Sequence, residues 1–238
     1  MESSSSLYSQ SQLEEPRPHA LPVNDNMAAV FATHTALKPC SHLVPHLRPT
    51  DRILDVGCGP GSITIDLAQQ VPSGHVVGLD KSATVVEQAR KAAAQQGVTN
   101  VTFKVGDAHD IRLPGPNGEG NGDETFDVVH AHMVLMHLSN PVQAFREMRR
   151  LVKTGGLVAT ADIAKATTHP ESATLKAQFK VYDRLARDRG AHPDAGKYSH
   201  VWASQAGFKW EEIQYSTSSW GFFGRRRGNY GVRGQKKG

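Results

Sequence analysis

Apolar residues from 52 to 161 follow two alternating patterns. Short runs of β-branched and aliphatic residues are separated by longer segments in which apolar residues recur at helical spacing. The short runs predict strands at 52–56, 74–79, 101–105, 126–130 and 156–161. The longer segments predict helices at 62–70, 83–96 and 141–151. Because strands that alternate with helices form parallel sheets with right-handed crossovers, we expect a Rossmann-like, doubly wound α/β fold with helices on both faces of a mostly parallel sheet.

The chain before this region predicts a tail and then helices. Residues 1–26 are rich in Ser, Gln, Pro and Glu, so we expect a disordered N-terminal segment. Apolar residues at helical spacing in 27–47 predict N-terminal helices. Pro39 and Pro45 divide them, because proline breaks a helix.

The chain after this region predicts a cover, a last strand and a tail. Residues 167–200 are amphipathic and carry apolar residues at helical spacing, at Leu175, Phe179, Tyr182 and Leu185. Residues 210–219 predict a sixth strand. Residues 221–238 are basic and Gly-rich and predict no strand. We therefore place the folded domain at 27–220 and expect one uncovered edge of its sheet.

Charge and composition narrow the possible partners. The net charge is +4, but six of the 27 basic residues lie in the acid-free tail at 221–238, and the remaining 21 face 23 acidic residues. The body is therefore slightly acidic, which argues against a nucleic-acid-binding face. No apolar run approaches the roughly 20 residues that span a bilayer. With neither a secretory signal nor a cysteine pattern typical of disulfides, we expect a cytoplasmic protein. The sequence does not indicate an oligomeric state.

The segment Asp55-Val56-Gly57-Cys58-Gly59-Pro60-Gly61 stands between a predicted strand and a predicted helix. Glycines let the backbone turn tightly and approach a ligand. Their spacing is one residue shorter than in the dinucleotide fingerprint, and Asp55 precedes them. An acid there works against a pyrophosphate, which prefers amides and the positive end of a helix. A sulfonium ligand with a free amino group tolerates that acid, so the loop favours a cofactor without phosphates.

Two acids follow later strands. Asp80 ends the second strand, where a carboxylate can accept two hydrogen bonds from the vicinal hydroxyls of a ribose. Asp107 follows the third strand, where it can accept from an adenine amino group. Each also has a structural interpretation, Asp80 as a helix cap and Asp107 as a turn former.

Histidines are the candidates for proton transfer. A histidine near its ordinary pKa can take a proton from a phenol, hydroxyl or amine as a methyl group arrives. We single out His34 and His132 as candidate bases. His42 and His46 have the helical spacing that could suggest a metal pair, but we predict no metal site there. Cys58 is interpreted as a small loop residue rather than a nucleophile.

These motifs, in this order, resemble the class I methyltransferases that depend on S-adenosylmethionine (SAM), above all the branch of ubiquinone and menaquinone biosynthesis and many small-molecule methyltransferases. The resemblance covers about 27–215 and is specific in the glycine loop and in Phe126–Gly156. It implies that the loop surrounds the methionine moiety of SAM, that Asp80 holds the ribose and that the adenine lies at Asp107. The full set of cofactor-binding residues it implies is Asp55, Gly57, Cys58, Gly59, Gly61, Asp80, Lys81, Asp107, Ala108 and His130.

The resemblance also implies an activity and one departure from the family. We expect methyl transfer from SAM to an O, N or C atom of a small, hydrophobic molecule in secondary-metabolite or quinone-like biosynthesis, with 27–47 and 167–200 covering the acceptor. The family completes its sheet with a seventh, antiparallel strand, for which the tail offers no candidate. A SAM-binding protein without catalysis is therefore the alternative, and an RNA-binding protein is a third hypothesis that rests on the tail alone.

Overall fold

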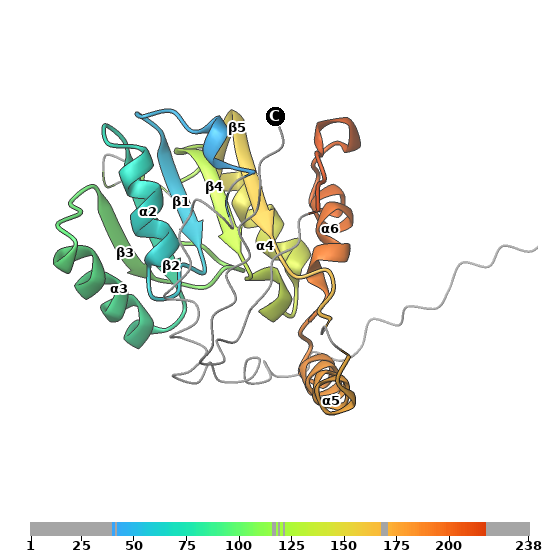
Figure 1. Ribbon diagram of the computed structural model, residues 1–238. Helices are drawn as coiled ribbons and strands as arrows, with labels where there is room; N and C mark the ends of the chain where they lie inside the picture. Colours follow the sequence, from blue (N-terminus) through green and yellow to red (C-terminus); the bar gives the residue numbers. More distant parts are fainter. Residues whose placement is uncertain are drawn as a thin grey trace, which may run out of the picture.

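The computed structural model describes residues 40, 42–115, 118, 120, 122–167 and 171–217 (Figure 1). Its centre is a five-stranded sheet in which every pair of neighbours is parallel, with the order β3-β2-β1-β4-β5. The strands are β1 (Arg52–Val56), β2 (His75–Asp80), β3 (Val101–Val105), β4 (Phe126–His132) and β5 (Val152–Ala161). The strand order reverses between β1 and β4. In such folds ligands bind beyond the carboxyl ends of the strands at this reversal point.

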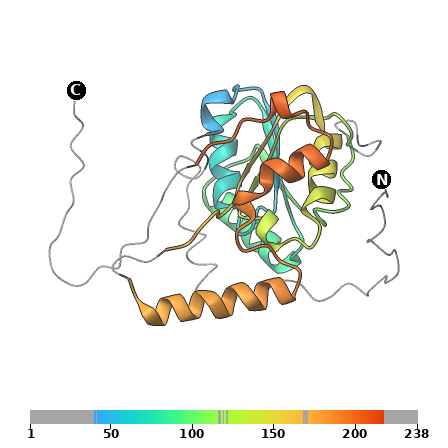
Figure 2. The same cartoon turned by 90° about the vertical axis from the view of Figure 1, so that its right-hand side faces the viewer.

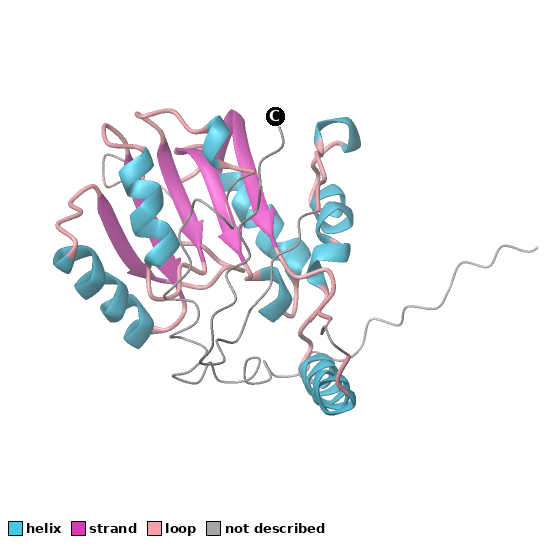
Figure 3. Ribbon diagram, viewed as in Figure 1, coloured by secondary structure: helices cyan, strands magenta, loops and turns pink. Residues whose placement is uncertain are grey.

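Helices cover both faces of the sheet (Figure 3). On one face lie α2 (Ser62–Gln70) and α3 (Ala83–Gln95), and on the other lies α4 (Pro141–Leu151) (Figure 1). Because successive side chains of a strand point to opposite faces of the sheet, the hydrophobic core is divided into two parts. Ile53 packs with the α2 residues Ile63 and Leu67, whereas Leu54 packs with Phe145 of α4. The predicted doubly wound α/β fold is thereby confirmed.

Local chemistry sets where these helices begin. The side chain of Asn140 accepts a hydrogen bond from Gln143 N at 3.1 Å, and Pro141 takes the first helical position of α4. The side chain of Ser82 does the same for α3, accepting from Val85 N at 3.3 Å. The remaining described elements are the helices α5 (Ala173–Asp188) and α6 (Ser199–Gln205) and the 3-10 helices η1 (Val44–His46), η2 (Leu135–His137), η3 (Ala195–Lys197) and η4 (Trp210–Glu212).

The predicted sixth strand is wrong over the residues that the structure describes. Trp210–Glu212 form η4, residues 213–217 adopt no regular structure, and 218–219 lie outside the described residues. Side-chain contacts replace a strand ladder there, because His200 of α6 lies 5.9 Å from the Trp210 ring and 5.0 Å from the Tyr215 ring. The last described strand is therefore β5, which pairs only with β4.

Smaller differences concern the other elements. β5 begins at Val152 rather than Gly156, because Val152 pairs with Phe126 across a register shift, and β4 continues to His132. Of the predicted N-terminal helices, residues 27–39 lie outside the described residues, and the part that is described contains η1.

The helix α5 lies beyond the carboxyl edge of the sheet and apart from the other helices (Figures 1 and 2). Only Ala186 of this helix is buried. The predicted helix forms, but most of the apolar side chains that predicted it are exposed: Leu175 is 41%, Phe179 39% and Leu185 43% exposed. Among the described residues, no helix is long and apolar enough to cross a membrane.

Candidate functional site

The glycine loop joins β1 to α2 at the carboxyl edge of the sheet. Gly57, Gly59 and Gly61 all have positive φ, at 69°, 54° and 87°. Gly57 backs onto Val134, whose Cγ2 would lie 2.3 Å from an added Cβ, and Gly61 backs onto Ala89 at 2.8 Å. An added Cβ at Gly59 would meet nothing within 4 Å. Gly57 and Gly61 therefore allow close packing of the loop against its neighbours, whereas the backbone of Gly59 faces open space.

Asp80 joins the loop to the end of β2. Its Oδ2 accepts a hydrogen bond from Gly59 N at 3.0 Å, and its Oδ1 accepts from Ser82 N at 2.9 Å. The amides of Gly57 and Cys58 also donate to Leu79 O, at 2.7 and 2.9 Å. Two motifs that the sequence placed far apart are thus in direct contact. Bare backbone beside a carboxylate at this edge of the sheet is the kind of arrangement that can hold an adenosine moiety.

Asp107 lies next along this edge, after β3. Lys81 Nζ donates to its Oδ2 at 3.0 Å, and His109 Nδ1 lies 2.8 Å from its Oδ1. Burial alone would raise the pKa of Asp107, but hydrogen bonds from the His109 amide, Lys81 and the His109 ring lower it well below its usual range. The group is therefore an anion at neutral pH and can accept hydrogen bonds. Ala108, beside it, is half-buried and packs against the core.

Asp55 and His130 lie beneath the loop and not in the open site. Asp55 is 2% exposed and His130 is fully buried. Thr64 Oγ1 donates to Asp55 Oδ2 at 2.6 Å, and His130 Nδ1 lies 2.7 Å from Asp55 Oδ1. Because the two side chains have almost no exposed surface, the direct contact with the methionine moiety expected for them does not fit this geometry.

The other predicted residues have mixed positions. Cys58 is 8% exposed, and burial, followed by the charges of Asp55 and Asp80, raises the pKa of its thiol far above the ordinary range. This supports its interpretation as a loop residue and not a nucleophile. His132 ends β4, with its ring stacked on His130 at a centroid distance of 6.4 Å. His34 lies outside the described residues.

Asp162 is a candidate site residue that the sequence motifs do not single out. It follows Ala161, the last residue of β5, which pairs with His132 at the end of β4. Its Oδ1 accepts from Met136 N at 3.1 Å, and its Oδ2 is buried without a hydrogen-bond partner. A buried carboxyl oxygen without a partner is uncommon and points to a role. Only the packing of 162 against η2 reveals it.

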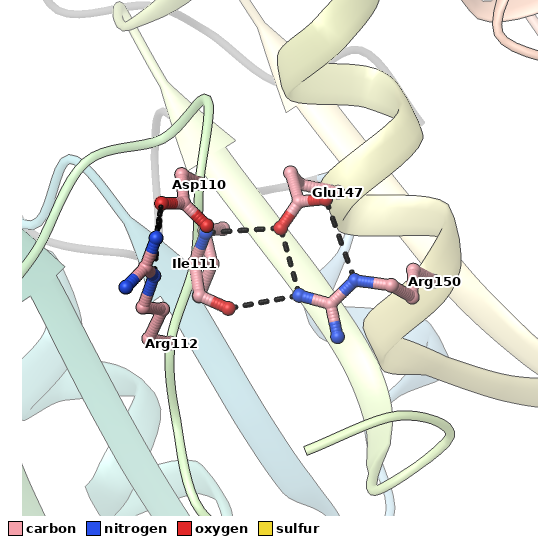
Figure 4. Close-up of a pocket in the computed structure, with 5 residues that line it drawn as sticks. All are labelled: Asp110, Ile111, Arg112, Glu147 and Arg150. Carbon is pink, nitrogen blue, oxygen red and sulfur yellow. Dashed lines mark hydrogen bonds and ion pairs between the residues drawn. The ribbon is translucent and has the colours of Figure 1, made fainter. Parts of the chain in front are cut away.

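A second cluster of charged residues lines a shallow pocket away from the glycine loop, between the segment after β3 and α4 (Figure 4). Glu147 Oε2 accepts from Ile111 N at 2.9 Å, and Arg150 Nη2 donates to Ile111 O at 2.8 Å and to Glu147 at 2.7 Å. These groups hold the segment after β3 against α4, so we assign them a structural role. No group of three or more His, Cys, Asp and Glu among the described residues is arranged to hold a metal ion.

Comparisons with known proteins agree with this geometry. A family model for a methyltransferase domain matches residues 47–216. An uncharacterized methyltransferase of Schizosaccharomyces pombe is 33% identical over 208 residues, which cover 84% of this chain and 72% of that protein. A demethylmenaquinone methyltransferase of Symbiobacterium thermophilum is 32% identical over 139 residues, covering 58% of this chain and 51% of that protein. A probable methyltransferase of Aspergillus luteorubrus is covered over 50% of its length. The chain therefore spans about half the length of this relative and of the demethylmenaquinone methyltransferase.

Solved structures show the same fold. A SAM-dependent methyltransferase from Aquifex aeolicus superimposes with a TM-score of 0.51 at 20% identity and covers 70% of this chain and 88% of its own. Phosphoethanolamine N-methyltransferase 2 of Haemonchus contortus, in complex with SAM, gives a TM-score of 0.55 at 21% identity and covers 72% of this chain and 36% of its own. With the family model matching most of the sequence and the glycine loop joined to Asp80 at the carboxyl edge, this chain belongs to the family of SAM-dependent methyltransferases.

Proposed function

We propose that this protein transfers a methyl group from SAM to an O, N or C atom of a small, hydrophobic acceptor. The observation that carries the proposal is the pairing of the open backbone at Gly59 with Asp80 at the carboxyl edge of the sheet, next to the point between β1 and β4 where the strand order reverses. Bound SAM supplies a methyl group on a sulfonium, which is already activated for displacement. The protein is therefore left to orient the acceptor, exclude water and accept a proton where the acceptor releases one.

The cofactor would extend along one half of the carboxyl edge. Asp107 at β3, Asp80 at β2 and the loop after β1 lie in that order across the sheet. We assign the adenine to Asp107, the ribose to Asp80 and the methionine moiety to the loop. The ends of β4 and β5 remain for the acceptor, because they form the other half of the same edge.

The acceptor half carries both a polar group and apolar surface. Asp162 stands at the end of β5 with one buried oxygen free of hydrogen bonds. The helix α5, whose exposed residues include Leu175, Phe179 and Leu185, lies beyond the same edge (Figure 2). We assign α5, within the segment 167–200, as a cover for the acceptor. Apolar walls with few polar groups suit a hydrophobic molecule, and relatives named demethylmenaquinone methyltransferase support a quinone-like acceptor.

Calorimetry with SAM and with S-adenosylhomocysteine tests the cofactor site. We expect the protein to bind both and Asp80→Ala to lose at least roughly tenfold in affinity, because a charged hydrogen-bond partner is removed. Glu87→Ala, on the exposed side of α3 in an ion pair with Arg90, is the matched control and should bind as the unchanged protein does. Failure of the unchanged protein to bind SAM would overturn the proposal.

Mass spectrometry then tests the acceptor class. The protein is incubated with SAM and with a panel of hydroquinones, phenols and aryl amines, and products heavier by one methyl group are sought. A methylated hydroquinone or phenol supports the proposed class. SAM binding without transfer to any member of the panel would favour the alternative, a SAM-binding protein without catalysis.

A further inference from the structure

Four polar side chains form a continuous buried chain on the α2 face of the sheet. Cys40 Sγ lies 3.3 Å from His130 Nε2, His130 Nδ1 lies 2.7 Å from Asp55 Oδ1, and Thr64 Oγ1 donates to Asp55 Oδ2 at 2.6 Å. Cys40, Thr64 and His130 have no exposed surface, and Asp55 is 2% exposed. Nothing in the proposed transfer reaction uses these groups directly.

Sheet register brings the chain together. Asp55 of β1 and His130 of β4 are direct partners in the parallel pairing, and both point to the face where Ile53 and Val128 pack against α2. Apolar residues occupy most other positions of this face. Burying charged groups among them costs free energy that a well-packed apolar pair would avoid. The chain of polar groups therefore calls for an explanation other than stability.

The hydrogen bond between Asp55 and Thr64 joins the two ends of the glycine loop. Asp55 belongs to β1, directly before the loop, and Thr64 lies in the first turn of α2, directly after it, nine residues apart. Each positive-φ glycine of the loop adds conformational freedom that must be lost before a ligand can bind. A fixed carboxylate at Asp55 restricts that freedom.

His130 is what fixes this carboxylate. Burial lowers the pKa of His130. The hydrogen bonds with Asp55 and Cys40 raise this pKa by more than burial lowers it, so the net shift is upward. Because a carboxylate only accepts hydrogen bonds, His130 Nδ1–H donates to Asp55, and the other ring nitrogen, Nε2, faces Cys40 Sγ. Asp55 keeps one oxygen for Thr64 in the same arrangement. On the other side, Cys40 connects the network to the segment that leads into η1.

We propose that His130 is a positioning residue for SAM binding, which acts through Asp55 and Thr64 to hold both ends of the glycine loop in the cofactor-binding conformation. The proposal rests on the assignment of this loop to SAM. Asp55 and His130 act on the cofactor only through the loop backbone. Cys40 completes the network as the partner of the second ring nitrogen.

Calorimetry with S-adenosylhomocysteine tests this inference in three variants. Thr64→Val keeps the shape of the side chain and removes the hydrogen bond to Asp55. His130→Gln removes the imidazole that donates to Asp55, and Thr64→Ser keeps the hydroxyl. We expect Thr64→Val and His130→Gln to weaken binding roughly tenfold, the worth of one hydrogen bond to a charged group, and Thr64→Ser to bind within about twofold of the unchanged protein. Circular dichroism must show each variant folded at the temperature of the titration.

Met148→Ala separates positioning from stability. Met148 is buried in the core on the α4 face, away from the network, so this variant loses stability without touching the loop. It should bind S-adenosylhomocysteine like the unchanged protein. Thr64→Val binding as tightly as the unchanged protein overturns the inference, and because this variant is nearly isosteric it decides the matter even where His130→Gln does not fold. Failure of the unchanged protein to bind SAM would instead overturn the cofactor site itself.

Discussion

At the scale of single residues, the acids at the strand ends differ in what their oxygens can reach. Asp80 and Asp107 are half-exposed at the edge, whereas Asp55 is buried and its hydrogen bonds go to Thr64 and His130 inside the protein. Their residue type and spacing are the same in kind, so the sequence could not separate them. What separates them is the direction of each side chain, which the alternation of β1 and the neighbouring His130 determine.

Asp162 predicts a dependence of stability on pH. Burial raises its pKa to about 7, against the lowering by the amides of Met136 and Leu135 and by His130. An unfolded Asp loses its proton near pH 4, so between about pH 4 and 7 the folded state binds more protons, and stability falls as pH rises through this window. Above about pH 7 the stability contributed by the protonated Asp162 is fully lost.

We therefore expect Asp162→Asn to raise the free energy of unfolding at pH 8 by roughly a few kcal/mol relative to the unchanged protein. At pH 4.5 the two should be nearly equal, since Asn resembles a protonated Asp. Urea unfolding at both pH values measures this. Asp188→Asn, exposed on α5, is the control and should change little at either pH. A gain of equal size at both pH values would contradict the explanation by ionisation.

The glycines predict contrasting effects of one substitution. Gly61→Ala forces a Cβ to 2.8 Å from Ala89 at φ 87° and should destabilise the fold, whereas Gly59→Ala meets open space and pays only the cost of its positive φ, about 1 kcal/mol. In return Gly59→Ala places a methyl group where the ligand would approach. Thermal unfolding should rank Gly61→Ala below Gly59→Ala, and calorimetry should show Gly59→Ala folded but impaired in SAM binding. The reverse ranking would refute the assignment of these two roles.

At the scale of elements, the segments with strong periodicity formed as predicted, and the segment without a pairing partner did not. α2, β1, β3 and α4 have the predicted bounds. Residues 210–217 have strand-like composition but pack by aromatic contacts with His200 instead. A strand requires a neighbour for its backbone groups, whereas a helix satisfies its own, so composition predicts helices more securely than an edge strand.

The helix α5 should be the least stable regular element among the described residues. A helix of 16 residues is marginal alone, and this one buries only Ala186. We expect amide hydrogens in its middle turns to exchange much faster than those of α2, whose residues Ile65 and Leu67 are buried. Hydrogen exchange followed by mass spectrometry measures both in one experiment. Comparable protection of the two helices would show that α5 has packing partners beyond those described.

At the scale of the whole molecule, the described sheet ends in two edge strands, β3 and β5, and no described strand follows β5. Residues 154–157 of β5 are exposed, and Leu157 is 37% exposed. An edge strand of this kind can pair with another chain. We expect Leu157→Lys to slow aggregation at high concentration while the midpoint of thermal unfolding stays within a few degrees. Light scattering during incubation measures the first and circular dichroism the second. Unchanged aggregation would show that the edge of β5 is not the surface responsible.

The sequence by itself determined the parallel α/β fold, the glycine loop and the acids that follow β2 and β3, because each depends on short-range pattern and spacing. Only the tertiary structure decided that Gly59 is open while Gly57 and Gly61 are packed, that Asp55 and His130 are buried partners, and that Asp162 lacks a partner for one oxygen. These properties arise from contacts between strands and helices distant in the chain. No local pattern records which neighbour will stand opposite a given side chain.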